Sequence, residues 1–339
     1  MKQPLPILTI LLVILGAAFH LSRDSRQWVG GIGYWIQYRL GRTPEFIFRG
    51  ERERYQRFYI REEIPLQFAN PTEEISWIPQ HLIPWIKHLE SGGLEVVILP
   101  VPTKLSIERK RVPAHLPNSD VENENPRGRY ARILEALEGH GVDLFSEYES
   151  VVAQVPPVDL YVPTDTHWTS RGIALAARAL LNRLRATGWK LPSYELVQRD
   201  TRRPDPAWDL FSPFVFPDWV IQRPEFAWRE PLFTLTPTKP IVNGPRVILA
   251  GSCYSNRLKG LDYSLSNLLG SSLGRVSLEV TVPLGTAIDS LYVMHREKWV
   301  FQKGDLLVIE LTMRHPFSSN TAPPRLFLEG DRDIAGEEH

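Results

Sequence analysis

Short, continuous apolar runs recur along the chain and predict buried strands. A short run that is apolar at successive positions and bounded by turn residues is typical of a strand that is buried on both faces. Two shorter runs are weaker strand candidates, at 142–145 and 158–162. The clearest runs lie at Leu94–Val101, Pro245–Ala250, Val276–Val282 and Asp305–Leu311.

Segments with helical spacing of apolar residues alternate with these runs. Two of them are His81–Glu90 and Tyr130–Gly141, and a third follows Thr169. Thr169 or Ser170 can cap this third helix, and Gly188 can end it. Strands that alternate with helices predict an α/β fold with layers and a mostly parallel central sheet.

The N-terminal run is different because it has no polar face. Residues Leu5–Phe19 carry no charge and follow Lys2. The run is longer than the core of most signal peptides, about 7–15 residues, and shorter than the about 20 residues of a membrane helix. A retained signal anchor is our preferred interpretation. A cleaved signal peptide stays open, with a weak cleavage site near Gly16 and Ala18. Both interpretations predict export.

Changes in composition divide the chain into four segments. Residues 1–22 hold the signal anchor or signal peptide, and 23–75 form a juxtamembrane lead-in rich in Arg and aromatic residues. The main domain is expected at 76–320, followed by a mobile, charged tail at 321–339. Inside the domain, residues 204–233 alternate Trp and Phe with prolines and charges. These rings either stack on sugars or pack an irregular loop against the core.

The overall composition sets only a few limits. The 339 residues are 43% apolar and 23% charged, which is ordinary for one large globular domain or two small ones. The formal net charge is zero, so nothing indicates a nucleic-acid partner. Cys253 is the only cysteine, which excludes an internal disulfide. A lone thiol in an exported protein is a liability unless it is buried or used.

Two polar side chains stand where the run at 158–162 passes into a helix. Asp165 and His167 are one residue apart, directly before Trp168 and Thr169. In an extended backbone, residues i and i+2 point to the same side. The carboxylate can therefore orient the imidazole toward a cleft, as in a nucleophile–His–Asp arrangement. The alternative is a polar pair that only satisfies the start of the helix.

A candidate nucleophile follows a later strand. The run at Pro245–Ala250 leads directly into the residues Gly-Ser-Cys-Tyr-Ser at 251–255. Glycine permits a sharp turn, and the N–H groups of a following helix can stabilise an oxyanion or a thiolate. Nucleophiles are often presented in this way at the carboxyl edge of a parallel sheet.

Together these segments resemble the alginate O-acetyltransferase family of SGNH-hydrolase-like periplasmic enzymes. Residues 162–169 resemble its Asp-x-His-Trp signature, and Pro102-Thr103-Lys104 resembles its Pro-x-Lys element. Residues 251–255 are similar to its Gly-Thr-Ser-[Phe/Tyr]-Ser block, and 308–314 to its closing strand. The resemblance implies a three-layer SGNH-hydrolase-like domain with a circularly permuted motif order, because Asp-x-His precedes the nucleophile.

The resemblance also implies roles for individual residues. Asp165 would orient His167, His167 would act as the base, and Cys253 takes the place of the family's serine nucleophile. A thiolate beside a histidine can accept an acyl group as a thioester. Ser252 or Ser255 could serve after a small register shift, and an inactive site also stays open. The resemblance assigns substrate binding to Lys104, Trp168, Tyr254 and Arg314.

The function implied by the resemblance is an exported O-acetyltransferase that acts on an exopolysaccharide or cell-wall glycan. The protein is expected in the periplasm, anchored in the inner membrane by its N-terminal segment. An integral-membrane O-acyltransferase would supply the acetyl group, and neither a cofactor nor a metal is expected. Two alternatives remain: a carbohydrate acetylesterase that uses the same residues, and a non-catalytic glycan-binding component of an export assembly.

Overall fold

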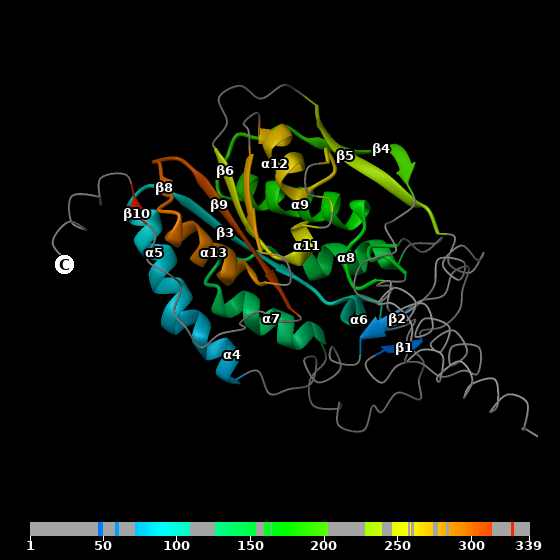
Figure 1. The fold of residues 1–339 in the computed structure, drawn as a ribbon, viewed down its shortest axis with the longest axis horizontal. Coiled ribbons are helices and arrows are strands. Elements are labelled where there is room, and N and C mark those ends of the chain that lie inside the picture. Colours follow the sequence, from blue (N-terminus) through cyan, green and yellow to red (C-terminus); the bar gives the residue numbers. More distant parts are fainter. Residues whose placement is uncertain are drawn as a thin grey trace, which may run out of the picture.

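The four clearest apolar runs form one parallel sheet (Figure 1). All three strand pairs are parallel, and β9 and β6 are buried at every position. Burial on both faces explains why these strands are apolar throughout. The four strand predictions are confirmed to within two residues at each end. In sheet order, the strands are β3 (Glu95–Val101), β9 (Leu306–Thr312), β6 (Val247–Gly251) and β7 (Ser277–Thr281).

This computed structural model describes most of the predicted main domain and little outside it. The N-terminal run and Arg314 lie outside the described residues, as do most of the excursion at 204–233 and all of the tail except 327–328. The boundaries of the four predicted segments therefore stay predictions. The described residues are 47–49, 58–60, 72–108, 126–153, 159–163, 165–202, 228–238, 246–256, 258, 261–273, 277–282, 285–313 and 327–328.

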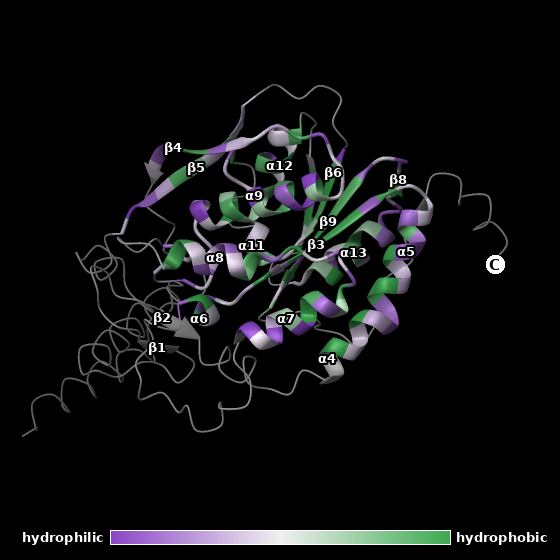
Figure 2. Cartoon of the chain, turned by 180° about the vertical axis from the view of Figure 1, so that it is seen from behind, coloured by the Kyte–Doolittle hydropathy of each residue, from purple (hydrophilic) through white to green (hydrophobic). Residues whose placement is uncertain are grey.

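Helices cover both faces of the sheet, so the predicted three-layer α/β architecture is confirmed (Figures 1 and 2). Figure 2 shows hydrophobic strands in the middle layer and helices that also carry hydrophilic residues. One face is covered by α5 (Ile83–Ser91), α7 (Pro126–Ala136) and α13 (Ala287–Arg296). The other is covered by α8 (Leu144–Val152), α9 (Ser170–Ala186) and α12 (Leu265–Leu273).

The helix predicted after Thr169 is confirmed as α9. The Thr169 side chain accepts a hydrogen bond from the N–H of Gly172, which caps the helix. Its apolar stripe is buried, including Ile173, Leu180 and Leu184. Gly188 follows its end with φ +101°, a conformation that glycine adopts without strain. This helix fixes the loop in front of it, which carries Asp165 and His167.

Two predicted strands are wrong. At 142–145, Gly141 makes only a single parallel bridge to Ile98, and Asp143 then caps α8 by accepting the N–H of Ser146. In the described part of 158–162, Tyr161 makes only a bridge to Trp168. Its neighbours bond across the same loop, with Val162 N–H donating to the oxygen of His167 at 3.0 Å. The loop therefore closes on itself instead of joining the sheet.

The remaining elements lie around this core. Residues before the predicted helix at His81–Glu90 are also helical, as α4 (Thr72–Trp77) and η1 (Ile78–Leu82). The short helices α6 (Lys104–Ile107) and α11 (Cys253–Asn256) follow β3 and β6. Smaller strand pairs are β1 (Ile47–Arg49) with β2 (Phe58–Ile60), β4 (Tyr194–Arg202) with β5 (Glu230–Pro237), and β8 (Val300–Phe301) with β10 (Phe327–Leu328).

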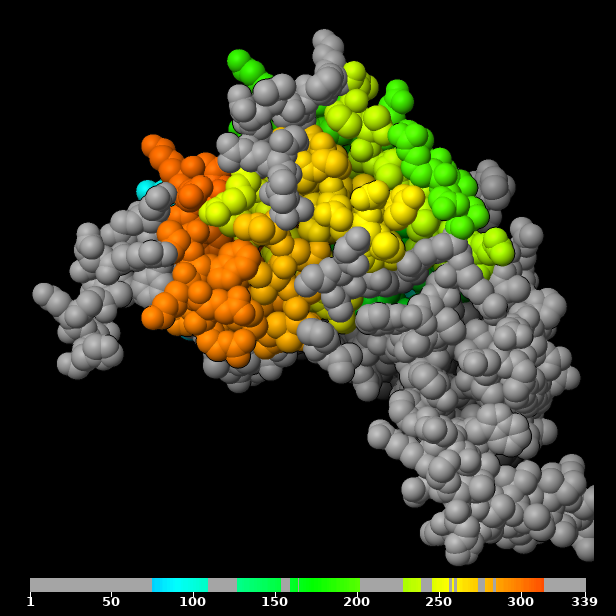
Figure 3. All heavy atoms as spheres, turned by 45° about the horizontal axis from the view of Figure 1, so that its top comes forward, coloured from blue at the N-terminus to red at the C-terminus, as the bar shows by residue number. Residues whose placement is uncertain are grey.

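The β4–β5 pair was not predicted from the sequence. It is antiparallel, and β5 packs against α9. The last residues of the predicted excursion, 230–233, belong to β5 rather than to an irregular loop. Figure 3 shows the green β4 and yellow-green β5 surface beside the yellow surface of α12. Across the ranges that the structure describes, no helix is both long and apolar enough to span a membrane.

Candidate active site

The register of the sheet brings three separate chain segments to one edge. Leu99 of β3 lies opposite Glu310 of β9, and Ala250 of β6 lies opposite Ile309. The residues that follow β3 and β6 therefore meet beside the carboxyl end of β9. Helices α6 and α11 start at this edge (Figure 1). Ligand sites of open parallel sheets lie at this edge.

Asp165 and His167 form a buried pair at this edge. Nδ1 of His167 lies 2.8 Å from Oδ1 of Asp165, and the two side chains are 1% and 8% exposed. The same oxygen accepts the backbone N–H groups of Thr166 at 2.6 Å and His167 at 3.2 Å. An ionised carboxylate only accepts hydrogen bonds, so Nδ1 carries the ring proton and Nε2 is the basic nitrogen.

Lys104 holds the loop that carries this pair. Its ammonium group donates to the backbone oxygens of Val162 at 2.8 Å, Pro163 at 2.8 Å and Asp165 at 3.0 Å. The residue is 0% exposed. Its ammonium group therefore holds the loop that carries Asp165 and His167. The substrate-binding role of Lys104 stays a prediction.

Trp168 and Tyr254 join the loop to the turn after β6. Nε1 of Trp168 donates to the backbone oxygen of Tyr254 at 2.8 Å, and the two rings meet edge to face at 6.0 Å. The Tyr254 ring also lies 5.0 Å from the His167 ring. Both aromatic residues are buried. Their packing aligns the loop with the turn after β6, and their substrate-binding roles stay predictions.

Ser252 and Ser255 are bound to one carboxylate. The hydroxyl of Ser252 donates to Oε1 of Glu310, and that of Ser255 donates to Oε2. The backbone N–H of Ser255 also donates to Oε2, at 3.0 Å. Both serines are 0% exposed. Their hydroxyl groups are therefore engaged inside the protein, away from the surface.

Glu310 is the site residue that the sequence reasoning missed. It is buried in β9, and burial raises the pKa of its carboxyl group to about 7, against the opposing effect of the hydrogen bonds from Ser252 and Ser255. The signal in the sequence was a single glutamate inside the apolar run at 305–311. A buried carboxyl group needs hydrogen-bond donors, and the sequence does not reveal which segment supplies them.

Cys253 is the first residue of α11 and lies in the turn between the two serines. It is half-buried and packs against the core. Gly251 must precede it, because a Cβ there would lie 2.8 Å from Cβ of Ser255 and 2.9 Å from Cγ2 of Thr281. Among the described residues, no hydrogen bond joins the Cys253 thiol to His167, so their pairing stays a prediction.

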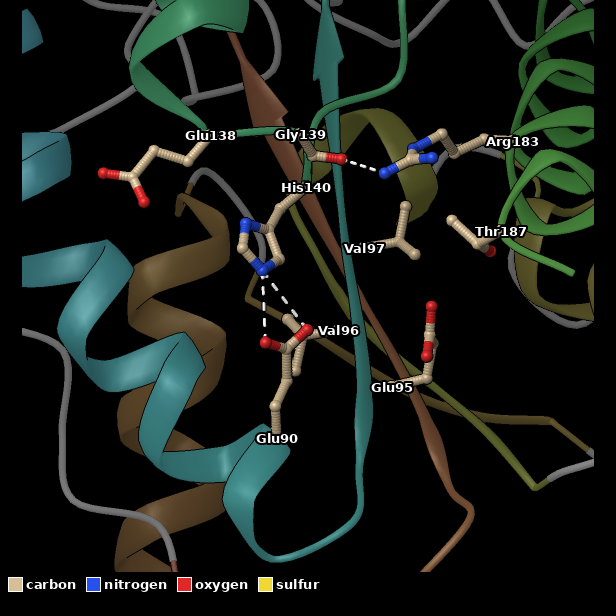
Figure 4. Close-up of a pocket in the computed structure, with 9 residues that line it drawn as sticks. All are labelled: Glu90, Glu95, Val96, Val97, Glu138, Gly139, His140, Arg183 and Thr187. Carbon is tan, nitrogen blue, oxygen red and sulfur yellow. Dashed lines mark hydrogen bonds and ion pairs between the residues drawn. The ribbon is translucent and has the colours of Figure 1, made fainter.

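A cavity lies at the opposite end of β3 (Figure 4). Its volume is about 170 Å³, and it is lined by charged side chains that include Glu95, His140 and Arg183. Figure 4 shows His140 directed at Glu90, with Nε2 3.2 Å from the carboxylate, and Arg183 directed at the oxygen of Gly139. Burial, then the nearby charge of Glu90, raises the pKa of Glu95. This cavity is separate from the edge that carries Asp165 and His167.

Comparison with known proteins agrees with the motifs. Residues 65–211 match the family model of the SGNH hydrolase-like domain of the acetyltransferase AlgX. The matched segment includes Lys104, Asp165 and His167 and ends before Cys253. No curated protein matches the chain in sequence.

Solved structures show the same fold. The O-acetyltransferase domain of Pseudomonas putida AlgJ superposes with a TM-score of 0.52 and 18% identity, over 81% of this chain and 93% of that one. Pseudomonas aeruginosa AlgX superposes with a TM-score of 0.52 and 15% identity, over 79% of this chain, which spans 62% of the length of AlgX. The predicted resemblance is therefore confirmed: in the sequence of residues 65–211 and in fold, the chain is similar to the SGNH hydrolase-like acetyltransferases.

Proposed function

We propose that this protein is an O-acetyltransferase that passes an acetyl group through Cys253 to a hydroxyl group of a polysaccharide. The observation that carries the proposal is the buried Asp165–His167 pair beside the turn that presents Cys253. This pair lies at the carboxyl edge of a fold shared with the O-acetyltransferase domain of AlgJ.

In the first half-reaction, Cys253 becomes acetylated. Nε2 of His167 accepts the thiol proton of Cys253, and the thiolate attacks the carbonyl carbon of the acetyl donor. The new C–S bond forms as the bond from the acetyl carbon to the leaving group breaks. His167 then returns its proton to the leaving group. Asp165 stabilises the imidazolium form of His167 between these two steps.

The second half-reaction transfers the acetyl group from Cys253 to the acceptor. A sugar hydroxyl gives its proton to Nε2 of His167 and attacks the thioester carbon. The C–O bond forms, the C–S bond breaks, and the Cys253 thiolate takes the proton back from His167. The oxyanion of each step needs an N–H donor. We assign this role to the backbone N–H of Cys253, because those of Tyr254 and Ser255 already donate to Ser252 and Glu310.

The engagement of the serines supports Cys253 as the nucleophile. The hydroxyl groups of Ser252 and Ser255 donate to Glu310, and both residues are buried. A serine nucleophile would have to leave the carboxylate and reach the surface before each turnover. Cys253 is half-buried and does not share this constraint.

The proposed location and partners follow from the apolar N-terminal run and the family resemblance. The run at 5–19 would carry the protein across the inner membrane and hold it there, with the catalytic domain in the periplasm. The acetyl group would come from an integral-membrane O-acyltransferase, and the acceptor would be an exopolysaccharide or cell-wall glycan.

A direct test is to load the protein with an activated acetyl ester and locate the adduct by mass spectrometry. We expect a hydroxylamine-sensitive acetyl group on Cys253, its loss in Cys253→Ala, and partial activity in Cys253→Ser, since the family pattern has serine there. Acylation that survives in Cys253→Ala and disappears in Ser252→Ala would identify the serine instead. If the protein becomes acetylated and then releases the acetyl group only to water, although oligosaccharide acceptors are present, an esterase is favoured. Loading of neither residue would overturn the enzymatic proposal.

A further inference from the structure

Glu310 occupies an unusual place for a carboxyl group. It is the one charged residue in the seven residues of β9, in the middle of the three-layer domain, and it is fully buried. Burying a carboxyl group is costly unless other groups compensate with hydrogen bonds. The mechanism above does not use this residue as an acid, a base or a nucleophile. Its hydrogen-bond partners therefore indicate what it does.

All the donors that bind Glu310 in the described contacts come from one turn. Oε1 accepts the hydroxyl of Ser252, while Oε2 accepts both the hydroxyl and the N–H of Ser255. The N–H of Ser252 lies farther from Oε2, at 3.5 Å. The turn is tied once more by the N–H of Tyr254, which donates to the Ser252 hydroxyl at 3.1 Å. The carboxylate thus binds the turn on both sides of Cys253.

We propose that Glu310 is a positioning residue whose carboxylate holds the Ser252–Ser255 turn so that Cys253 faces His167. The inference rests on the proposed function, since it takes Cys253 as the nucleophile. Gly251 extends the same arrangement, because its backbone oxygen accepts the hydroxyl of Ser290 from α13 at 2.6 Å. The turn is therefore held between β9 and α13, while its thiol is left outside both sets of bonds.

The chemistry explains why a carboxylate suits this place better than an amide. An ionised carboxylate accepts hydrogen bonds on both oxygens, as the two serines require. A glutamine has the same shape, but its NH₂ group would face the donors of one serine. Glu310→Gln should therefore release one side of the turn while filling the same volume.

The state of ionisation should matter too. Protonation of Glu310, with its pKa raised to about 7 by burial, turns one acceptor into a donor and weakens the hold on the turn at lower pH. The groups near Glu310 are the turn itself, which supplies its hydrogen-bond donors, and Tyr148 of α8. Burial first, and Glu310 among the nearby groups, raises the pKa of Tyr148, so Tyr148 stays neutral. Leu99 of β3 faces Glu310 without charge.

The test measures the reactivity of Cys253 directly. Since it is the only cysteine, the rate of alkylation by iodoacetamide reports on this thiol alone. The full chain is alkylated between about pH 6 and pH 9, a range that includes the ionisation of a free thiol at about 8.5. In Glu310→Gln we expect the rate at pH 7 to fall by about tenfold or more, because the thiolate is the reactive form and a displaced thiol loses the histidine that favours it. The profile should move toward that of a free thiol.

Asp305→Asn is the matched control. Asp305 is a buried acid directly before β9, at the opposite end of the strand, and pairs with Arg246. The Asp305→Asn substitution should lower the free energy of unfolding without changing how the alkylation rate depends on pH. This is what a purely structural role predicts. Ser255→Ala, which removes one hydroxyl donor, should give an intermediate profile and serves if Glu310→Gln does not fold. Wild-type profiles in these folded variants would overturn the positioning role.

This experiment separates the inference from the proposed function. Alkylation needs neither an acetyl donor nor a polysaccharide. If acetyl transfer proceeds through Cys253 but the variants alkylate like the wild type, only the positioning role fails. If the variants lose thiol reactivity and the wild type never takes up acetyl, the positioning role stands and the transferase proposal fails.

Discussion

His167 is held by a short-range contact and aligned by a long-range one. Its bond to Asp165 spans two residues, whereas its ring packs on Tyr254, 87 positions along the chain. The first contact sets which nitrogen is basic, and the second places the ring beside Tyr254, in the turn of Cys253. The proposed role of the histidine as a base depends on both.

Replacing this histidine tests the role of the base. His167→Ala should slow acetyl transfer by about 10²–10⁴-fold, the usual contribution of a general base, while the protein still unfolds cooperatively. Single-turnover rates with an activated acetyl ester give the measurement. His140→Ala is a suitable control, because His140 also pairs with a carboxylate, that of Glu90, but lies at the far end of β3. Activity of His167→Ala within about tenfold of the wild type would remove the residue from the mechanism.

Among the structural elements, the loop between α8 and α9 depends most on contacts from elsewhere. It is not a strand of the sheet, and its described backbone is held by Lys104 from α6 and by the N-terminal cap of α9. Tyr161 adds a bond from its hydroxyl to the backbone oxygen of Pro102 at 2.5 Å. The segment after β3 thus acts as the support of the Asp165–His167 pair.

Removing the support should affect stability and catalysis together. Lys104→Met keeps the length of the side chain but leaves three buried carbonyl oxygens without this donor, so we expect the free energy of unfolding to fall by about 3 kcal/mol. In the folded fraction, kcat should fall while KM for the acceptor changes little, because the Lys104 ammonium group donates to the loop that carries Asp165 and His167. Lys87→Met is the control: Lys87 is 61% exposed in its pair with Glu138, and such pairs contribute about 0–1 kcal/mol. Equal effects of the two substitutions would contradict the supporting role.

At the scale of the whole molecule, the apolar segment at 5–19 and the catalytic domain are expected to lie in different environments. The segment has no polar face, so it suits a membrane or a translocation signal better than a folded core. The domain has a buried hydrophobic core of its own. The proposed function requires that export carry this domain across the membrane.

A reporter fused after residue 339 tests this expectation. Alkaline phosphatase at that position should be active, because it folds outside the cytoplasm, whereas a fluorescent protein that requires the cytoplasm should stay dark. Deleting residues 5–19 should reverse both signals. If the full chain fused to the fluorescent protein is fluorescent and the phosphatase fusion is inactive, export is wrong. The proposed exopolysaccharide acceptor would then be wrong as well.

The sequence by itself determined the features that depend on neighbouring residues. Four strands, the α9 helix with its Thr169 cap, and the spacing of Asp165 and His167 could be read directly, because burial on two faces, capping and side-chain alternation leave local patterns. The family motifs then indicated the layered fold and the place of Cys253.

The tertiary structure alone decided which residues at this edge of the sheet bind one another. Lys104, Trp168 and Tyr254 match the family motifs, yet they are buried and bind the backbone or pack on one another. Glu310 looked like part of a strand and proved to bind the turn of Cys253 from 55 and 58 residues away. These roles depend on which strands lie side by side and in what register, and a local sequence pattern carries no information about either.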